Sequence, residues 1–195
     1  MGGRVNLDGF INGAISEDVN GRITYSYAKQ SDGWQTDIDT GREYGKDDKF
    51  AIRGTVEFTL SNETDVVASL HAGRDKSTPL SPQNDDSEAR ANDTLFFDGL
   101  FDGLLDVPAD STSVRVGELP VSRDEDGFGG SLTINHEFES FDLTAISGFE
   151  SYERTVVDNY DGTSAAFLDL DQFGKLDQFS QELRLTSTTG DDYTW

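Results

Sequence analysis

Apolar and polar residues alternate with a period of two along most of this chain. In residues 5–16 the odd positions include Val5, Leu7, Ile11 and Ile15, whereas the even positions are mostly polar. Such alternation gives a β-strand one apolar face and one polar face. No segment shows a helical period, so the sequence predicts an all-β chain. Seven segments carry the strand pattern: 5–16, 22–30, 50–60, 66–73, 128–138, 141–152 and 179–186.

The links between these segments alternate between short and long. The short links are rich in Gly, Asn, Asp, Ser or Thr, as tight turns require, and span 17–21, 61–65, 139–140 and 187–192. The long links span 31–49, 74–127 and 153–178. Structureless loops beyond about 15 residues are uncommon in soluble domains. Here three occur at the same end of a predicted antiparallel up-and-down meander, which is the asymmetry of an outer-membrane β-barrel.

Strand lengths and aromatic positions agree with this interpretation. A tilted membrane-spanning strand needs about 9–11 residues, and the segments 50–60, 128–138 and 141–152 reach that length. Outer-membrane barrels also carry aromatic girdles at both interfaces. We expect one girdle near the turns and one toward the loops, formed respectively by Phe58, Phe138 and Phe141 and by Tyr25, Tyr27, Phe50 and Phe149.

A soluble antiparallel sandwich or jelly roll is the alternative fold. Its strands also alternate apolar and polar residues, because one face packs on the core and the other is solvated. Alternation by itself favours this alternative. The repeated order of short and long links favours the membrane barrel instead, as part of a larger barrel to which this chain contributes about seven or eight strands.

Composition and charge exclude several classes of function. The chain has 195 residues, with 15 Lys and Arg against 38 Asp and Glu, and a formal net charge of −23. No basic face is available for a nucleic-acid partner. The long links hold 25 of the acidic and 10 of the basic residues, which indicates an exposed acidic surface that repels simple anions. The absence of cysteine excludes a disulfide scaffold, a thiolate metal site and a cysteine nucleophile.

The two ends of the chain suggest a fragment. The N-terminal residues lack the apolar stretch of a signal peptide, and the chain stops at Trp195, where a new alternation begins. No run approaches the roughly 18–20 apolar residues of a membrane-spanning helix. We therefore expect residues 1–195 to be part of a barrel domain, without its C-terminal strands.

Three stretches resemble the barrel domain of TonB-dependent outer-membrane receptors. Residues 21–34 (GRITYSYAKQSDGW) are similar to an early barrel strand that enters an outer loop. Residues 50–60 (FAIRGTVEFTL), followed by a turn and 66–70, resemble the next hairpin. The most specific stretch is 178–187 (QFSQELRLTS), which is similar to a mid-barrel strand of this family. The resemblance covers nearly the whole chain.

This resemblance implies a 22-stranded barrel that is closed by an N-terminal plug and imports a scarce ligand with energy relayed by TonB. Among the ligand classes that the resemblance implies, an iron-siderophore is favoured over a vitamin or a glycan. The implied partners are outer-membrane lipid, an iron chelate and the TonB complex, and the implied location is the Gram-negative outer membrane. The plug and the TonB box are not identified in this chain, so no binding residue is carried over from the family.

Most polar constellations in the sequence favour structural roles. His71 and His136 have no His or Cys partner in their own segments, so neither indicates a metal site. The glycines of 127–130 lack the Lys and the helix of a phosphate loop and indicate small residues in a strand. Residues 158–162 and 169–171 offer oxygen ligands for Ca²⁺ but lack the EF-hand spacing, which favours a solvated acidic loop.

Catalysis and cofactors are not expected. Acidic pairs are too abundant to mark an acid–base site, and neither a Gly-x-Ser-x-Gly elbow nor a His-Glu-x-x-His motif occurs. Two charge pairs, Arg53 with Glu57 and Glu182 with Arg184, fall on the polar face and are predicted to pair inside a barrel. The ligand-contact candidates are loop aromatics, which also suit packing within their own loops: Trp34, Phe96, Phe97, Phe101 and Phe167.

Three functional hypotheses remain open at this point. The first is a TonB-dependent receptor fragment. The second is another outer-membrane barrel, either a passive channel or a small eight-stranded barrel. The third is a soluble secreted β-domain that binds Ca²⁺ or carbohydrate and is monomeric in buffer. An isolated barrel segment would instead expose apolar faces and open strand edges, which promote aggregation.

Overall fold

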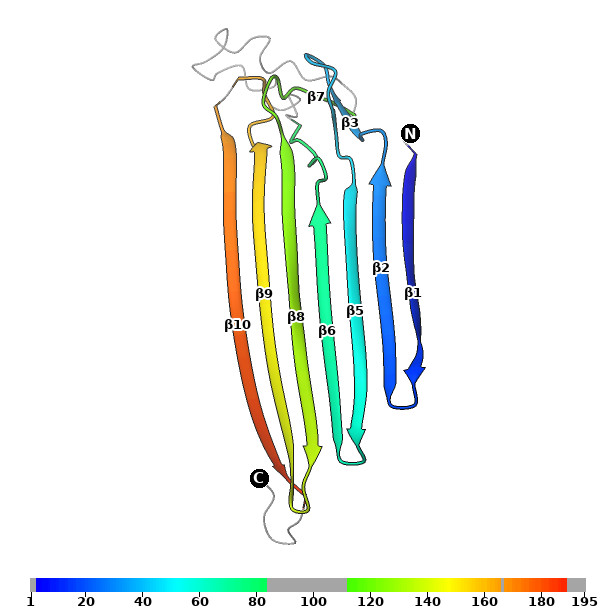
Figure 1. Cartoon of the computed structure of the whole chain (residues 1–195). Coiled ribbons are helices and arrows are strands. Elements are labelled where there is room, and N and C mark those ends of the chain that lie inside the picture. Colours follow the sequence, from blue (N-terminus) through cyan, green and yellow to red (C-terminus); the bar gives the residue numbers. More distant parts are fainter. Residues whose placement is uncertain (1–2, 84–111, 166, 189–195) are drawn as a thin grey trace.

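The computed structural model describes residues 3–83, 112–165 and 167–188, and seven long strands dominate this part of the chain (Figure 1). Within these ranges no helix is long and apolar enough to cross a membrane. The predicted all-β class is confirmed. The seven strands are β1 (Arg4–Ser16), β2 (Val19–Gln30), β5 (Asp48–Ser61), β6 (Thr64–Asp75), β8 (Ser122–Glu137), β9 (Phe141–Asn159) and β10 (Asp169–Ser187).

These strands form one sheet in which every strand pairs antiparallel with its neighbour along the chain, in the order β1-β2-β5-β6-β8-β9-β10. The up-and-down meander predicted from the sequence is therefore confirmed. The hairpin turns lie together at one end of the sheet and the longer connections at the other (Figure 1). The turns step progressively along the strand direction from β1 to β9, which is the stagger that tilted strands of a barrel require.

The boundaries at the loop end differ from the prediction. The link expected over 153–178 is largely strand, because β9 continues to Asn159 and pairs there with Asp169 at the start of β10. The connection that remains is only 160–168. Beyond Tyr152 the alternation weakens, since the outer ends of β9 and β10 carry polar residues on both faces. In this part of β9 and β10 the backbones pair although the side chains do not alternate, so the sequence pattern did not predict these strand ends.

The two faces of the sheet differ sharply in character. Successive cross-strand partners place Ile11, Ile23, Leu70, Phe149 and Phe179 in one transverse row on the apolar face. Protein does not cover this face in the described ranges: Ile11 is 79% exposed and Phe179 is 72% exposed. We call the opposite side the polar face, and define it by Asn12, Arg53, His71, Ser131, Glu150 and Gln178.

The buried core lies outside the middle of the sheet. The buried hydrophobic residues of the described ranges are Tyr44, Val114, Val116, Val121 and Val156. Four of them form one cluster with the partly buried Leu119 at the loop end, and Val156 lies near the loop end of β9. A soluble sandwich buries the apolar faces of its sheets against each other. In this structure the apolar face of the sheet is exposed, and the cluster of buried residues lies in the loops.

A small second sheet organises these loops. It joins β3 (Gln35–Asp37) and β4 (Glu43–Tyr44), which lie between β2 and β5, to β7 (Ser113–Val114), which lies between β6 and β8. β3 pairs antiparallel with β4 and parallel with β7. The long links predicted as structureless therefore contain a folded substructure, seen beside the strand ends in Figure 1. The expected alternation of residues 193–195 lies outside the described residues.

The predicted girdles are partly confirmed. Phe138 and Phe141 stack at the turn end with ring centroids 4.5 Å apart, and the His136 ring meets Phe138 edge-on at 4.2 Å. Phe50 lies in the third position of β5, at the loop end. Phe149 is different, because it occupies the middle of β9 rather than the loop end.

Gly130 provides a test of how the apolar face is built. A Cβ atom at this position would lie 2.6 Å from Leu70 Cδ2 and 2.9 Å from the Ser69 carbonyl oxygen. Gly54 occupies the same transverse row, and a Cβ atom there would meet nothing within 4 Å. We expect Gly130→Ala to destabilise the fold by about 1–3 kcal/mol through overpacking, and Gly54→Ala to be neutral or slightly stabilising. Thermal unfolding followed by the β-sheet circular dichroism signal tests this difference, and equal midpoints for the two variants would contradict it.

Candidate functional site

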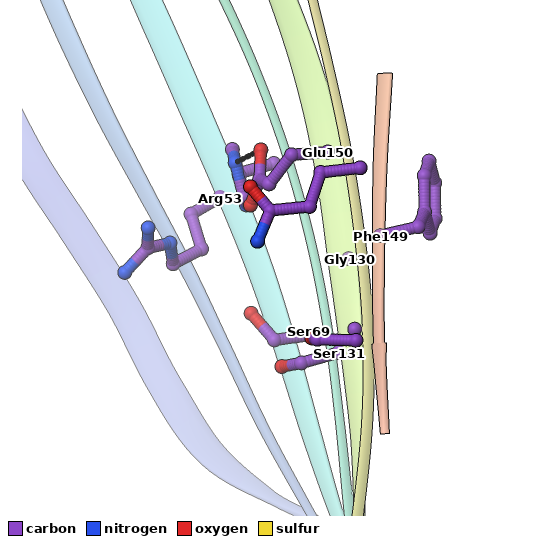
Figure 2. A pocket seen from close by; sticks show the side chains of 10 residues that line it. Arg53, Ser69, Gly130, Ser131, Phe149 and Glu150 are labelled. Atoms are coloured by element: carbon purple, nitrogen blue, oxygen red, sulfur yellow. Dashed lines mark hydrogen bonds and ion pairs between the residues drawn. The ribbon is translucent and has the colours of Figure 1, made fainter. Parts of the chain in front are cut away.

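The centre of the polar face carries a polar depression between β5 and β10. Its lining includes Arg53, Ser69, Ser131, Glu150 and Gln178. Figure 2 shows Arg53, Glu150 and the two serines projecting from one side of the sheet, while Phe149 points to the other side. The strict period of two produces this separation, because Phe149 and Glu150 are adjacent residues of the same strand.

A hydrogen bond between two side chains crosses this depression. His71 Nε2 on β6 lies 3.1 Å from Glu150 Oε2 on β9, although β8 runs between these strands. The contact is possible because Gly129 is the residue of β8 between them. A Cβ atom on Gly129 would lie 2.2 Å from Glu150 Oε2, so the carboxylate occupies the space where any other side chain would begin. The glycines of 127–130 are thus small residues inside a strand, as predicted, and Gly129 makes room for the contact between His71 and Glu150.

Arg53 projects beside this pair and forms no ion pair within the described ranges. Its predicted partner Glu57 lies on the same face four residues further along β5, two repeats of the pleat away, and the two side chains form no ion pair. The other predicted pair is confirmed, with Arg184 Nη2 donating to Glu182 Oε1 at 2.6 Å. The depression therefore offers a free guanidinium, a carboxylate and several hydroxyl groups to whatever occupies the polar face.

A ladder of charges crosses the polar face nearer the loops. Lys49 Nζ lies 3.4 Å from Asp47 Oδ1 and 3.5 Å from Asp75 Oδ2, and Arg123 lies between Asp75 and Glu125 at 3.7 Å and 3.6 Å. The members are partly exposed, so each pair adds at most about 1 kcal/mol to stability. Their alternating signs nonetheless hold neighbouring strand ends in register. The ladder runs from β1 to β9 through Arg4, Asp47, Lys49, Asp75, Arg123, Glu125 and Arg154.

A buried carboxylate joins the two loop segments above the ladder. Asp37 is fully buried and accepts hydrogen bonds from the Thr40 hydroxyl at 2.7 Å, from the Asp39 N–H at 3.1 Å and from the Gly117 N–H at 3.1 Å. These donors belong to both long links. Burial raises the pKa of the neighbouring Tyr44 phenol, and the negative charge of Asp37 raises it further. This role could not be predicted from the sequence, because Asp37 is one of six acidic residues in the predicted link 31–49.

The connection between β9 and β10 is held by a second set of acceptors. Asp161 accepts hydrogen bonds from the N–H groups of Thr163 and Leu168, at 2.8 Å and 2.6 Å, and Asn159 accepts one from the Gly162 N–H at 2.7 Å. Partial burial alone would raise the pKa of Asp161, but the hydrogen bonds outweigh burial and lower it. No group of three potential metal-ligating side chains occurs in the described part of the chain. These residues form hydrogen bonds within their own connection, which is buried at Asn159 and Thr163 rather than solvated as predicted.

The five ligand-contact candidates are only partly placed. Trp34 and Phe167 lie in loops at the same end of the sheet and are each more than half exposed. Trp34 also packs against Gly45, where a Cβ atom would lie 3.2 Å from the tryptophan side chain. The remaining candidates, Phe96, Phe97 and Phe101, lie outside the described residues.

The comparison with known proteins concerns the fold. No protein-family profile and no curated protein matches this chain in sequence. In structure, the chain is similar to the ferric yersiniabactin uptake receptor FyuA from Yersinia pestis, with a TM-score of 0.66 and 13% sequence identity. The match covers 98% of this chain and 26% of the receptor, so the chain spans about a quarter of the receptor's length. The seven-stranded meander has the fold of a segment of an outer-membrane barrel.

We expect Asp37→Asn to loosen the small sheet, because the amide NH₂ would face N–H and O–H donors that now point at a carboxylate. A buried hydrogen-bond partner lost in this way costs about 1–3 kcal/mol. Hydrogen exchange should show faster exchange at the Val116 and Gly117 amides and unchanged protection in β5 and β6. The matched control is Asp39→Asn, which removes only a partly exposed ion pair with Arg115. Equal effects of both substitutions would contradict the role of Asp37.

The hydrogen bonds to Asp161 predict a local dependence on pH. The pKa of Asp161 is lower in the folded loop, so the stabilisation is present above the ordinary aspartate pKa of about 3.9 and is lost as the pH falls through the lower folded value. Hydrogen-exchange protection of the Thr163 and Leu168 amides, corrected for intrinsic rates, should therefore decrease in this acidic range. Asp161→Asn should remove the dependence, and the same pH profile in both proteins would show that another group is responsible.

Proposed function

We propose that this chain is a segment of the barrel domain of a TonB-dependent outer-membrane receptor that imports a scarce ligand, with an iron-siderophore as the favoured class. The observation that carries the proposal is the uncovered apolar face of a seven-stranded meander. Lipid is the natural cover for such a face, because the inner strands of the sheet pair their backbone groups with neighbouring strands on both sides. The fold likeness to an iron-chelate uptake receptor supports the transport role.

The proposal assigns each side of the sheet a surrounding. The apolar face contacts outer-membrane lipid, the polar face lines the barrel interior, and the loop substructure faces outward. Residues 1–195 then form a partial barrel domain, and the plug and the C-terminal strands belong to parts of the protein outside this sequence. The edges of β1 and β10 pair with the adjoining strands of the closed barrel, which removes their open backbone groups.

Cell fractionation tests the membrane assignment. The complete protein that carries this chain should be found in the outer membrane, should resist extraction by high salt and carbonate, and should require detergent for release. Recovery as a monomer in detergent-free buffer would favour the soluble β-domain that binds Ca²⁺ or carbohydrate.

Uptake of a radiolabelled ferric chelate tests the transport assignment. In iron-starved cells, deletion of the gene should lower uptake, and an uncoupler should abolish uptake while leaving surface binding intact. A passive channel would instead give uptake that the uncoupler does not affect. That outcome would replace the receptor with the alternative outer-membrane barrel.

We propose Trp34 and Phe167 as ligand contacts at the outer end. Stacking of an aromatic side chain on a ligand contributes about 0.5–1.5 kcal/mol to binding. Trp34→Ala or Phe167→Ala should therefore weaken binding of the ferric chelate to whole cells by about 3–10-fold. The control is Ile38→Ala, which shortens another exposed apolar side chain in the same loop as Trp34. If neither aromatic variant changes the binding constant, Trp34 and Phe167 are not ligand contacts.

A further inference from the structure

Two arginines of the polar face, Arg22 and Arg53, form no ion pair within the described ranges. Nearly every other Lys and Arg residue of these ranges pairs with a carboxylate, as expected in a chain with 38 acidic residues. Arg74 is the exception, and it lies on the apolar face as the cross-strand partner of Phe50. Arg22 and Arg53 are both exposed, so their charges are accessible from the polar face.

The strand register brings these two arginines together. Arg22 on β2 is the partner of Thr55 on β5, and Arg53 on β5 is the partner of Thr24 on β2. The arginines are therefore diagonal neighbours on one face of two paired strands. Diagonal neighbours are about 7–8 Å apart and within reach of long side chains. Figure 2 shows Arg53 extending toward the side of β2 and away from Glu150. Two like charges at this separation repel each other unless an anion lies between them.

An exposed aromatic ring lies beside the arginines. Phe10 on β1 interrupts the alternation of its strand, because it is an apolar residue between Asp8 and Asn12 on the polar face. Its side chain is 61% exposed. Arg22 Cζ lies 4.7 Å from the centroid of the Phe10 ring, a cation–π contact that orients the guanidinium. The Phe10 ring thus gives the polar face an apolar surface next to two cations.

The nearby acidic groups leave this positive charge in excess. Glu57 is the other diagonal neighbour of Arg22 and lines the same depression, yet the two side chains form no ion pair. Glu150 is already hydrogen-bonded across β8. Asp8 lies in the next row toward the loops, two strands away from Arg53. Two guanidinium groups with one adjacent carboxylate carry a net charge of about +1, which suits a single negative charge.

We propose that Arg22, Arg53 and Phe10 form a binding site for a carboxylate group. Each guanidinium offers a planar fork of N–H donors that matches the two oxygen atoms of a carboxylate. The Phe10 ring provides a surface for the carbon atoms that carry the carboxylate. The carboxylate belongs either to a small organic acid or to an acidic side chain of a polypeptide at the polar face. The inference goes beyond the proposed transport function and does not depend on which ligand is imported.

The first experiment tests binding of a small organic acid. It uses the complete protein in detergent, with benzoate as the probe, its neutral isostere benzamide for comparison, and isothermal titration calorimetry as the readout. Benzoate should bind about tenfold more tightly than benzamide, and Arg22→Gln and Arg53→Gln should each weaken benzoate binding about tenfold. Phe10→Ala should weaken it about threefold. The control is Arg184→Gln, which removes a cation from the same face that is already paired with Glu182 and should leave benzoate binding unchanged.

The second experiment identifies a carboxylate supplied by a polypeptide. Such a group already fills the site, so benzoate does not bind to the unchanged protein. Arg22→Gln and Arg53→Gln should then each lower the midpoint of thermal unfolding of the complete protein, because each removes a donor to the bound carboxylate. Without a bound carboxylate the same substitutions relieve repulsion between the arginines and raise the midpoint or leave it unchanged. The sign of the shift therefore reports whether the site is occupied.

The outcomes are separate from those of the proposed function. Equal binding of benzoate and benzamide overturns the carboxylate site, as does benzoate binding that neither arginine substitution weakens or that Arg184→Gln weakens equally. Absence of benzoate binding together with an unchanged or raised midpoint in both arginine variants also overturns it. Each of these results leaves the receptor proposal standing. Conversely, arginine-dependent benzoate binding by a protein that does not fractionate to the outer membrane supports the site and overturns the receptor.

Discussion

One constraint governs this molecule: a wide apolar face that no part of the described chain covers. Hydrophobic burial is the main driving force of folding in water, yet the large apolar side chains of this sheet stay exposed while a handful of loop residues form the core. Within the described chain, the sheet therefore obtains its order from continuous backbone pairing, and the proposed lipid surrounding would cover its apolar face. In lipid, paired backbone groups become essential rather than merely favourable, because no water can replace a missing hydrogen bond.

The polar face is stabilised by contacts between side chains of different strands. A glycine on an intervening strand allows such a contact to span more than one strand. Gly129 lets the Glu150 carboxylate cross β8 to His71, an interaction that strand adjacency alone would not allow. Near the loops, alternating charges join one strand end to the next. The polar face thus combines cross-strand charge pairs with an Arg53 guanidinium that forms no ion pair within the described ranges.

The loops form a third region with its own stabilisation. Two long links that are far apart in the sequence share one small sheet, one apolar cluster and the Asp37 carboxylate. Loops usually carry recognition while a rigid scaffold positions them. Here the connection between β9 and β10 is also shorter than the pattern suggested, because both strands extend well past the apolar region. The loop end is consequently a folded substructure at which the side chains of Trp34 and Phe167 are more than half exposed.

The sequence by itself determined the strands, their order and the two faces, because a period of two fixes which side chains share a face and short turns fix antiparallel neighbours. It also placed Arg184 beside Glu182 and the glycines of 127–130 in a strand. Tertiary structure alone decided which pairs form across strands, such as His71 with Glu150 rather than Arg53 with Glu57. It also decided the role of Asp37 and the outer ends of β9 and β10. These features depend on contacts between residues distant in sequence, and local alternation carries no information about them.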